Sequence, residues 1–516
     1  MNEVDLNINH TSGSAQLKKP LVILGILLLS LIFGYTIGNY GLNIGIILSG
    51  SLLFVVYFAI IILYPQFGVY TTIATGFVLL GISRYIRPDL PIGFLIDILI
   101  ILTVVAMFLH KFPKRIDWHP AKKDITLLAF IWLMYCALEV VNPEAQSVAA
   151  WLSAIRPLGF YFFMFVVFAL MYLNTPKRLK ILFRIWGIFS ILASIKGIIQ
   201  LHVGLDAWEK AWLDSGAAQT HVLFGRLRVF SFYSDAGQFG ANQAYTAVVF
   251  SILFFEEKKL KEKIFDAIVA ILGFYGMAIS GTRGALFIPF AGFALYLFHK
   301  KNIYLLTIGM IAGLAIFVFF KYTTIGQSNY NIRRMRSAFN PQDPSLQVRL
   351  ENQRKLRIYM ATRPFGGGLG HGGVKAQKFV PNAFLSNIPT DSWYVLIWVE
   401  TGIVGLFLHL FIQLYTLGKA SYLLMFRLRD PKLIAMMSAL SSGMLGVMLA
   451  SYGNAVIGQL PTSLLIYSSM AIMLNSTTID KYIRVNLRKQ NLSSRYTLRL
   501  SKNITPALHT MTENTQ

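Results

Sequence analysis

Residues 42–64 read LNIGIILSGSLLFVVYFAIIILY, a run of 23 residues without a charged side chain. A membrane-spanning helix needs about 20 apolar residues, so this stretch is long enough to cross a bilayer. Similar runs recur along most of the chain and give about 14 candidate spans. Charged residues make up only 14% of the sequence, whereas soluble domains carry about 25%. These features predict an all-α fold, a polytopic membrane helix bundle.

The spacing of the apolar runs divides the chain into six parts. They are an N-terminal tail (1–20), the N-terminal spans with a first outer loop (21–236), the central spans (237–320), a long basic loop (321–390), the C-terminal spans (391–475) and a basic tail (476–516). The single cysteine, Cys136, lies in an apolar run, so no intrachain disulfide can form.

The basic residues predict how the spans are oriented. The chain carries 47 Lys and Arg against 23 Asp and Glu. In a soluble protein this excess would suggest nucleic acid, but in a membrane protein it indicates cytoplasmic loops near anionic lipid headgroups. We therefore expect membrane lipids, and no nucleic acid, as partners. Positive charge is concentrated in alternate short loops, while those near 142–156 and 453–457 nearly lack it. This pattern places both termini in the cytoplasm.

The long loop 321–390 falls on the outer side of this topology, where its charge is unusual. It holds eleven Lys or Arg residues and two acidic residues. Such a segment is either a solvated surface that meets anionic headgroups or a site for a polyanionic ligand such as pyrophosphate. The Asp343-Pro344 pair is typical of a helix start, and helical spacing continues to Thr362. A helical subdomain is therefore expected here.

Four polar patches on the outer side hold the candidate site residues. The first contains Arg226 and Arg228, shortly before a span. The second is a tight turn between two spans, Ser280-Gly-Thr-Arg283-Gly. An arginine at such a turn costs a few kcal/mol if it faces lipid. Arg283 is therefore either anchored by a structural partner or at the interface, or used to bind a ligand.

The third patch is a glycine-rich run that follows Arg363, with Gly366, Gly368 and Gly370 before His371. Glycines let a backbone approach a ligand closely and expose N–H donors. The run is not a Walker loop, because no strand precedes it and no Lys-Ser/Thr pair follows. His371 is either a general base near neutral pH or a structural histidine.

The fourth patch opens a later span. Asp391 and Ser392 stand at its start, and Glu400 lies further inside. Asp391 either caps this helix or takes part in chemistry. A carboxylate at the depth of Glu400 is costly to bury, so we expect it to face the bundle interior.

In this order, the patches resemble the O-antigen ligase and polymerase family of bacterial envelope enzymes, over about residues 226–410. The family motifs S-x-x-R-G-A, P-x-x-G-x-G and E-x-G-x-x-G read here as Ser280 to Ala285, Pro364 to Gly370 with one further Gly, and Glu400 to Gly405. One departure matters, because family members usually carry His-Asn where this chain has Asp391-Ser392. Either Asp391 replaces the base, or His371 supplies it, or the chemistry has changed.

The resemblance implies a donor, an acceptor and a compartment. The donor would be a glycan on undecaprenyl pyrophosphate, and the acceptor a hydroxyl on a growing glycan or a lipid A-core. Transfer would take place on the periplasmic face of a bacterial inner membrane. Arginines suit the charge that develops on a leaving pyrophosphate. The candidates for this task are Arg228 and Arg283, with Arg226 and Arg363 behind them.

The proton of the acceptor would go to His371 or Asp391. No cofactor is expected. No metal is expected either, because the chain holds no D-x-D motif and the family is described as metal-independent. Ligases and polymerases share this scaffold, and the departure at Asp391 points away from a standard lipid A-core ligase.

Two other classes of function are compatible with many spans. A flippase or exporter of lipid-linked oligosaccharide would place its binding residues near the membrane midplane on broken helices. An envelope scaffold would need no site at all. The polar patches gather on one face with a long loop over them, which favours the enzyme.

Overall fold

The computed structural model describes residues 20–40, 42–86, 92–223 and 225–488. Residues 1–19 of the predicted N-terminal tail and 489–516 of the predicted C-terminal tail lie outside them. The described strands are two-residue segments, β1 (Val222–Leu223) and β2 (Arg226–Leu227), which pair antiparallel. Eight described helical segments are long and apolar enough to cross a membrane. The prediction of an all-α polytopic bundle is therefore confirmed.

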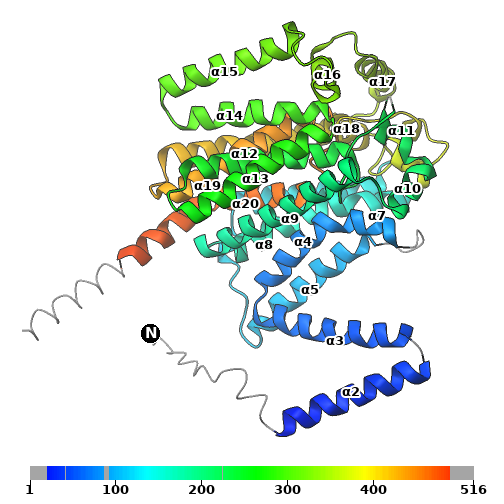
Figure 1. Ribbon diagram of the computed structural model, residues 1–516, viewed down its shortest axis with the longest axis vertical. Coiled ribbons are helices and arrows are strands. Elements are labelled where there is room, and N and C mark those ends of the chain that lie inside the picture. The colour runs from blue at the N-terminus through cyan, green and yellow to red at the C-terminus, as the bar shows by residue number, and fades with distance from the viewer. Residues whose placement is uncertain (1–19, 41, 87–91, 224, 489–516) are drawn as a thin grey trace, which may run out of the picture.

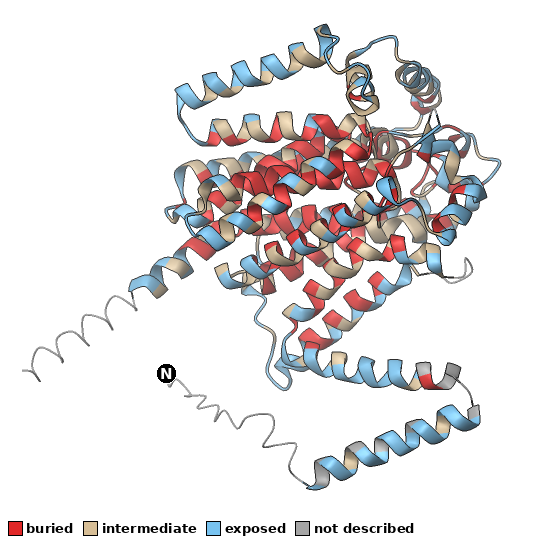
Figure 2. Cartoon of the chain, viewed as in Figure 1, coloured by how far each residue is buried: buried red, intermediate tan, exposed pale blue. Residues whose placement is uncertain are grey.

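Four helices pack closely against one another within the bundle (Figures 1 and 2). They are α12 (Ala236–Glu256), α13 (Leu260–Ile279), α14 (Phe287–His299) and α19 (Pro431–Ala450). Small residues let their backbones approach closely. A Cβ atom at Gly273 of α13 would lie 2.9 Å from the Gln243 carbonyl oxygen of α12. These contacts hold the segments that lead into the first two polar patches.

The remaining packed helices surround this layer. They are α4 (Gln66–Ile82), α5 (Phe94–Lys111), α6 (Asp124–Leu138), α7 (Val148–Ile155), α8 (Tyr161–Tyr172), α9 (Pro176–His202), α18 (Trp393–Phe426) and α20 (Thr462–Leu474). Short 3-10 and π turns occur between or at the ends of the described helices: η1 (Ser83–Tyr85), η2 (His119–Ala121), η3 (Glu139–Val141), η4 (Arg156–Phe160), η5 (Leu213–Ala217), η6 (Arg283–Leu286), η7 (Ser337–Phe339), η8 (Val374–Lys378) and η9 (Leu385–Asn387).

Three apolar helices lie at the edges of the bundle and are largely exposed (Figure 2). They are α2 (Pro20–Tyr40), α3 (Leu42–Leu63) and α15 (Ile303–Tyr322). None of the residues of α15 is buried, although it is the most hydrophobic of the candidate spans. A helix that is apolar on all sides and exposed is suited to contact with lipid.

The two longer loops, which the sequence places on the outer side, are folded and lie at one end of the bundle, on the right in Figure 1. Their helices are α10 (Ala207–Trp212), α11 (Ala218–His221), α16 (Tyr330–Arg336) and α17 (Pro344–Met360). The side chain of Asp343 accepts a hydrogen bond from the Leu346 N–H at 3.1 Å, which caps α17. The predicted helix of the long loop is therefore confirmed, and α17 lies over the polar patches.

Candidate functional site

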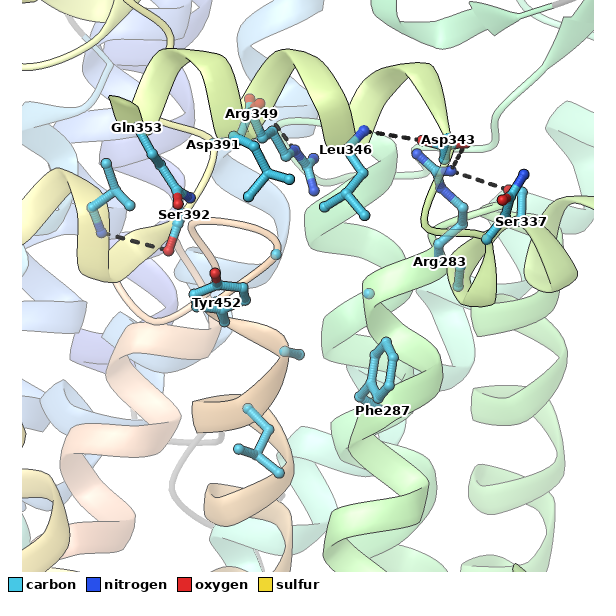
Figure 3. A pocket seen from close by; sticks show the side chains of 18 of the residues that line it. Arg283, Phe287, Ser337, Asp343, Leu346, Arg349, Gln353, Asp391, Ser392 and Tyr452 are labelled. Atoms are coloured by element: carbon cyan, nitrogen blue, oxygen red, sulfur yellow. Dashed lines mark hydrogen bonds and ion pairs between the residues drawn. The ribbon is translucent and has the colours of Figure 1, made fainter. Parts of the chain in front are cut away.

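A cavity of about 450 Å³ opens beneath α17, where the start of α14, the start of α18 and the end of α19 meet (Figure 3). Its volume lies in the range of small-molecule sites. Arg283 and Asp343 lie at one side of the cavity, and Arg349 and Asp391 at the other. Phe287 and other apolar side chains form much of the remaining wall. The cavity therefore combines a charged rim with an apolar lining.

The turn between α13 and α14 places Arg283 under α17. Gly281 takes a positive φ of 57° there, a backbone conformation that glycine adopts readily. The Arg283 Nη1 donates to the Ser337 Oγ at 3.1 Å and forms an ion pair with Asp343. Burial raises the pKa of Asp343, but the hydrogen bond to Arg283, its positive charge and the backbone N–H groups of α17 together outweigh burial and leave the pKa below its usual range. Arg283 thus anchors the start of α17, and it also lines the cavity.

Two further arginines lie against the same turn. The Arg228 Nη2 donates to the Thr282 Oγ1 at 3.3 Å, and the Arg334 Nε donates to the Gly281 carbonyl oxygen. Burial and, to a smaller extent, the charge of Arg334 together lower the pKa of Arg228 to about 10. Guanidinium groups gathered in this way favour an anion nearby. Arg334 was missed from the sequence, where it is one of eleven basic residues in its loop.

Asp391 is accessible and does not cap α18. The N-cap is Ser392, whose Oγ accepts from the Val395 N–H at 3.5 Å. The interpretation of Asp391 as a helix cap is therefore wrong, since α18 begins one residue later than that role requires. The Asp391 carboxylate instead pairs with the Arg349 Nε at 3.1 Å, and its side chain is 45% exposed. Arg349 was also missed, because nothing local in α17 marks it.

The glycine-rich run packs against a kink in α18. Gly402 has φ 69° and ψ −172°, which interrupts the helix. The Gly367 N–H donates to the Val399 carbonyl oxygen at 2.8 Å, and the Val404 N–H donates to the Pro364 carbonyl oxygen at 3.3 Å. The P-x-x-G-x-G and E-x-G-x-x-G motifs therefore form one structural unit.

Positive φ values at Gly366, Gly368 and Gly370 explain the composition of the run. A Cβ atom at Gly370 would lie 2.2 Å from the Ala150 carbonyl oxygen of α7. The glycines were expected to let the backbone approach a ligand closely. Much of this close approach is instead to other parts of the protein backbone.

His371 lies inside this unit, with only 2% of its surface exposed. Its Nε2 accepts from the backbone N–H groups of Gln146 at 2.9 Å and Ser147 at 3.1 Å. Its Nδ1 lies 3.0 Å from the Leu369 carbonyl oxygen. An Nδ1–H tautomer satisfies all three contacts. Both ring nitrogens are thus engaged by backbone groups.

Arg226 and Arg363 lie away from the lining of the cavity. Arg226 is exposed, with its guanidinium 5.4 Å from the centre of the Tyr330 ring. The Arg363 Nε pairs with the Glu144 Oε2 at 3.1 Å, and its guanidinium stacks over Tyr359. The structure therefore brings Arg228 and Arg283 together and separates Arg363 from them.

A second cavity of about 460 Å³ opens at the same end and shares Pro389 and Asp391 with the first. Glu400, which is buried as predicted, lines it. So do Gln238, Asn454 and Gln459, three polar residues that sequence reasoning did not single out. Within the described ranges, no three His, Cys, Asp or Glu side chains are grouped to hold a metal ion.

Comparison with known proteins gives one family. Residues 268–410 match the family model described as O-Antigen ligase. The matched segment includes Arg283, the glycine-rich run, Asp391 and Glu400, and it begins after Arg228. The match supports the O-antigen ligase and polymerase family for this chain. No curated protein matches it.

Proposed function

We propose that this O-antigen ligase-type membrane protein transfers glycan from undecaprenyl pyrophosphate to an acceptor hydroxyl. The observation that carries the proposal is that Arg283 and Asp391 line one cavity of about 450 Å³. One side supplies positive charge for a leaving pyrophosphate, and the other supplies a carboxylate that can accept a proton. The apolar part of the wall suits the first units of the polyprenyl chain.

In the proposed reaction, the acceptor oxygen bonds to the anomeric carbon of the donor while the bond from that carbon to the phosphate oxygen breaks. The electron pair of the broken bond stays on the pyrophosphate, which remains attached to the lipid. Arg283 and Arg349 border the place where this charge develops. Arg228 and Arg334 add positive charge behind the turn that carries Arg283.

Asp391 takes the proton of the acceptor hydroxyl. Its carboxylate is accessible, and the Arg349 ion pair holds it at the edge of the cavity. His371 is the weaker candidate, because both of its ring nitrogens already contact backbone groups. The carboxylate at position 391 thus replaces the histidine that the family usually carries there. Neither a metal ion nor a cofactor enters this scheme.

The positions of the cavities favour transfer at one face over passage through the bundle. The cavity in the middle of the bundle, beside His409 and Tyr467, holds only about 10 Å³. The proposal places the two cavities that border Asp391 on the periplasmic face of a bacterial inner membrane and both termini in the cytoplasm. The basic loops at the opposite end support this orientation.

The proposal is tested by donor consumption with purified protein, a fluorescent undecaprenyl-pyrophosphate glycan and a crude envelope acceptor. We expect Arg283→Ala and Asp391→Asn each to lower the rate by about 100-fold. Arg354→Ala is the matched control, because Arg354 is exposed on α17 and lines neither cavity. Arg354→Ala should transfer glycan at the wild-type rate. Addition of EDTA should not change the transfer rate of the wild-type protein.

Size-exclusion profiles must show that the variants are folded, since Arg283 also anchors α17. Arg283→Lys retains the charge and gives a second reading if the alanine variant is unstable. Wild-type activity in a folded Arg283→Ala or Asp391→Asn protein would remove that residue from the reaction. If the protein instead moves the donor across vesicle membranes without transferring glycan, the proposed enzyme is wrong and the protein is a flippase.

A further inference from the structure

The second cavity differs in charge from the first, although the two share Asp391. The charged residues that line it are Asp235, Asp391, Glu400 and Lys375. Asp391 is already paired with Arg349, so the other two carboxyl groups face the single ammonium group of Lys375, which is exposed. Among the described residues, no arginine lines this cavity. An anionic ligand would meet the Asp235 carboxylate here, and like charges are unfavourable at short range.

Two buried hydrogen-bond acceptors in this cavity have no donor among the described residues. They are the Oε2 of Glu400 and the Oε1 of Gln238, whose residues are 4% and 2% exposed. Leaving such an atom without a partner costs about 1–3 kcal/mol, so buried acceptors are normally satisfied. Two of them in one cavity indicate a ligand that donates hydrogen bonds.

Both side chains are held in position by their other atoms. The Glu400 Oε1 accepts from the Gly372 N–H at 3.3 Å. The Gln238 Nε2 donates to the Thr462 Oγ1 at 2.8 Å and to the Gln459 carbonyl oxygen at 3.2 Å. These oxygen partners fix the orientation of the Gln238 amide. The two open acceptors are thus part of a built site.

We propose that the second cavity binds the acceptor and selects a sugar without phosphate, either neutral or bearing an amine. This inference rests on the proposed transferase function. Sugar hydroxyls and ammonium groups donate hydrogen bonds to carboxylate and amide oxygens, whereas an ionised phosphate only accepts them. Asp391 borders both cavities. A hydroxyl of an acceptor sugar in the second cavity therefore reaches the Asp391 carboxylate, which also faces the donor in the first cavity.

The proposal separates two kinds of acceptor. A growing glycan of uncharged or amino sugars donates hydrogen bonds to the two open oxygens and brings no negative charge to the carboxyl groups of the lining. A phosphorylated lipid core brings its charge next to them. The structure therefore favours a growing glycan as the acceptor, which is the reaction of a polymerase.

The test is calorimetric binding to purified full-length protein in detergent, without donor. The first probe is the neutral oligosaccharide released by mild acid from the lipid-linked glycan of the source cells. The second is the deacylated, phosphorylated core oligosaccharide of the same cells. We expect the neutral probe to bind at least tenfold more tightly than the phosphorylated one. Equal or tighter binding of the phosphorylated probe would overturn the inference.

Glu400→Gln keeps the shape of the side chain and an oxygen for the Gly372 N–H, but it replaces an open acceptor with an NH2 donor. We expect it to weaken binding of the neutral probe by at least tenfold. Glu351→Gln on the exposed face of α17 is the control and should bind as wild type does. Unchanged affinity in a folded Glu400→Gln protein would refute the role of Glu400. The wild-type comparison of the two probes does not depend on this variant.

Donor binding, measured by the polarisation of the fluorescent donor, distinguishes the two proposals. If wild-type protein neither binds the donor nor transfers from it, the proposed function fails. If it transfers to phosphorylated core but not to neutral glycan, the function stands and the acceptor inference fails.

Discussion

At the level of single residues, His371 and Asp391 are in opposite situations. The ring of His371 accepts hydrogen bonds from the Gln146 and Ser147 N–H groups, while Asp391 is open to two cavities. His371→Ala would leave both N–H groups without an acceptor, at about 1–3 kcal/mol each. We expect a clearly lower unfolding temperature for His371→Ala, measured by thermal unfolding in detergent.

His371→Gln supplies the control for this prediction, because its amide oxygen can accept the same N–H groups. It should recover most of the lost stability and retain most of the transfer activity, with an unchanged pH–rate profile. A stable His371→Gln protein without activity would instead make His371 the base. Stability and activity therefore report different roles for this residue.

Sequence reasoning located individual residues best where their role is local. Asp343 was predicted as a helix cap, and it caps α17. Its second contact, with Arg283, joins residues 60 positions apart and has no signature in either segment. The ion pair between Arg349 and Asp391 has no local sequence signature either. Nor does the unpaired Oε1 of Gln238, because in the sequence this residue is an ordinary polar side chain near the start of a helix.

At the level of elements, the kink of α18 holds the glycine-rich run. Gly402 occupies a region of φ and ψ that is almost restricted to glycine. A Cβ atom there would lie 2.0 Å from the Pro364 carbonyl oxygen. We expect Gly402→Ala to destabilise the protein by more than the 1–3 kcal/mol of backbone strain alone, and to abolish transfer because it separates Pro364 and Glu400.

Gly418→Ala in the same helix is the matched control for this prediction. A Cβ atom at Gly418 meets nothing within 4 Å, and alanine favours a helix by about 1 kcal/mol over glycine. Its unfolding temperature should equal or exceed that of wild type. If Gly402→Ala were as stable and active as Gly418→Ala, the kink would not be what positions the run.

The elements themselves were largely predictable, because apolar length and helix-start signals act locally. The run at 42–64 became α3, and Asp343-Pro344 marked the start of α17. The glycine-rich run was recognised, but its role was not, since its backbone approaches α7 and α18 as well as the second cavity. Which helix faces a loop depends on tertiary packing, and no local pattern records it.

At the scale of the whole molecule, the two cavities that border Asp391 and the lysine-rich short loops lie at opposite ends of the bundle. Both cavities that border Asp391 lie beneath or beside the long loop, at the end where α16 and α17 are seen in Figure 1. Lys258 lies between α12 and α13, and Lys301 lies between α14 and α15, at the other end. The positive-inside rule assigns that end to the cytoplasm, so the proposed reaction needs a donor on the far side of the membrane.

Cysteine labelling tests this orientation directly, because Cys136 is fully buried and should leave the wild-type protein unlabelled. Ser345 and Lys258 are both exposed, at opposite ends. A membrane-impermeant maleimide added to spheroplasts should label Ser345→Cys, whereas Lys258→Cys should react only after the membrane is permeabilised. The reverse pattern would place Arg283 and Asp391 in the cytoplasm, and a periplasmic transfer reaction would then be impossible.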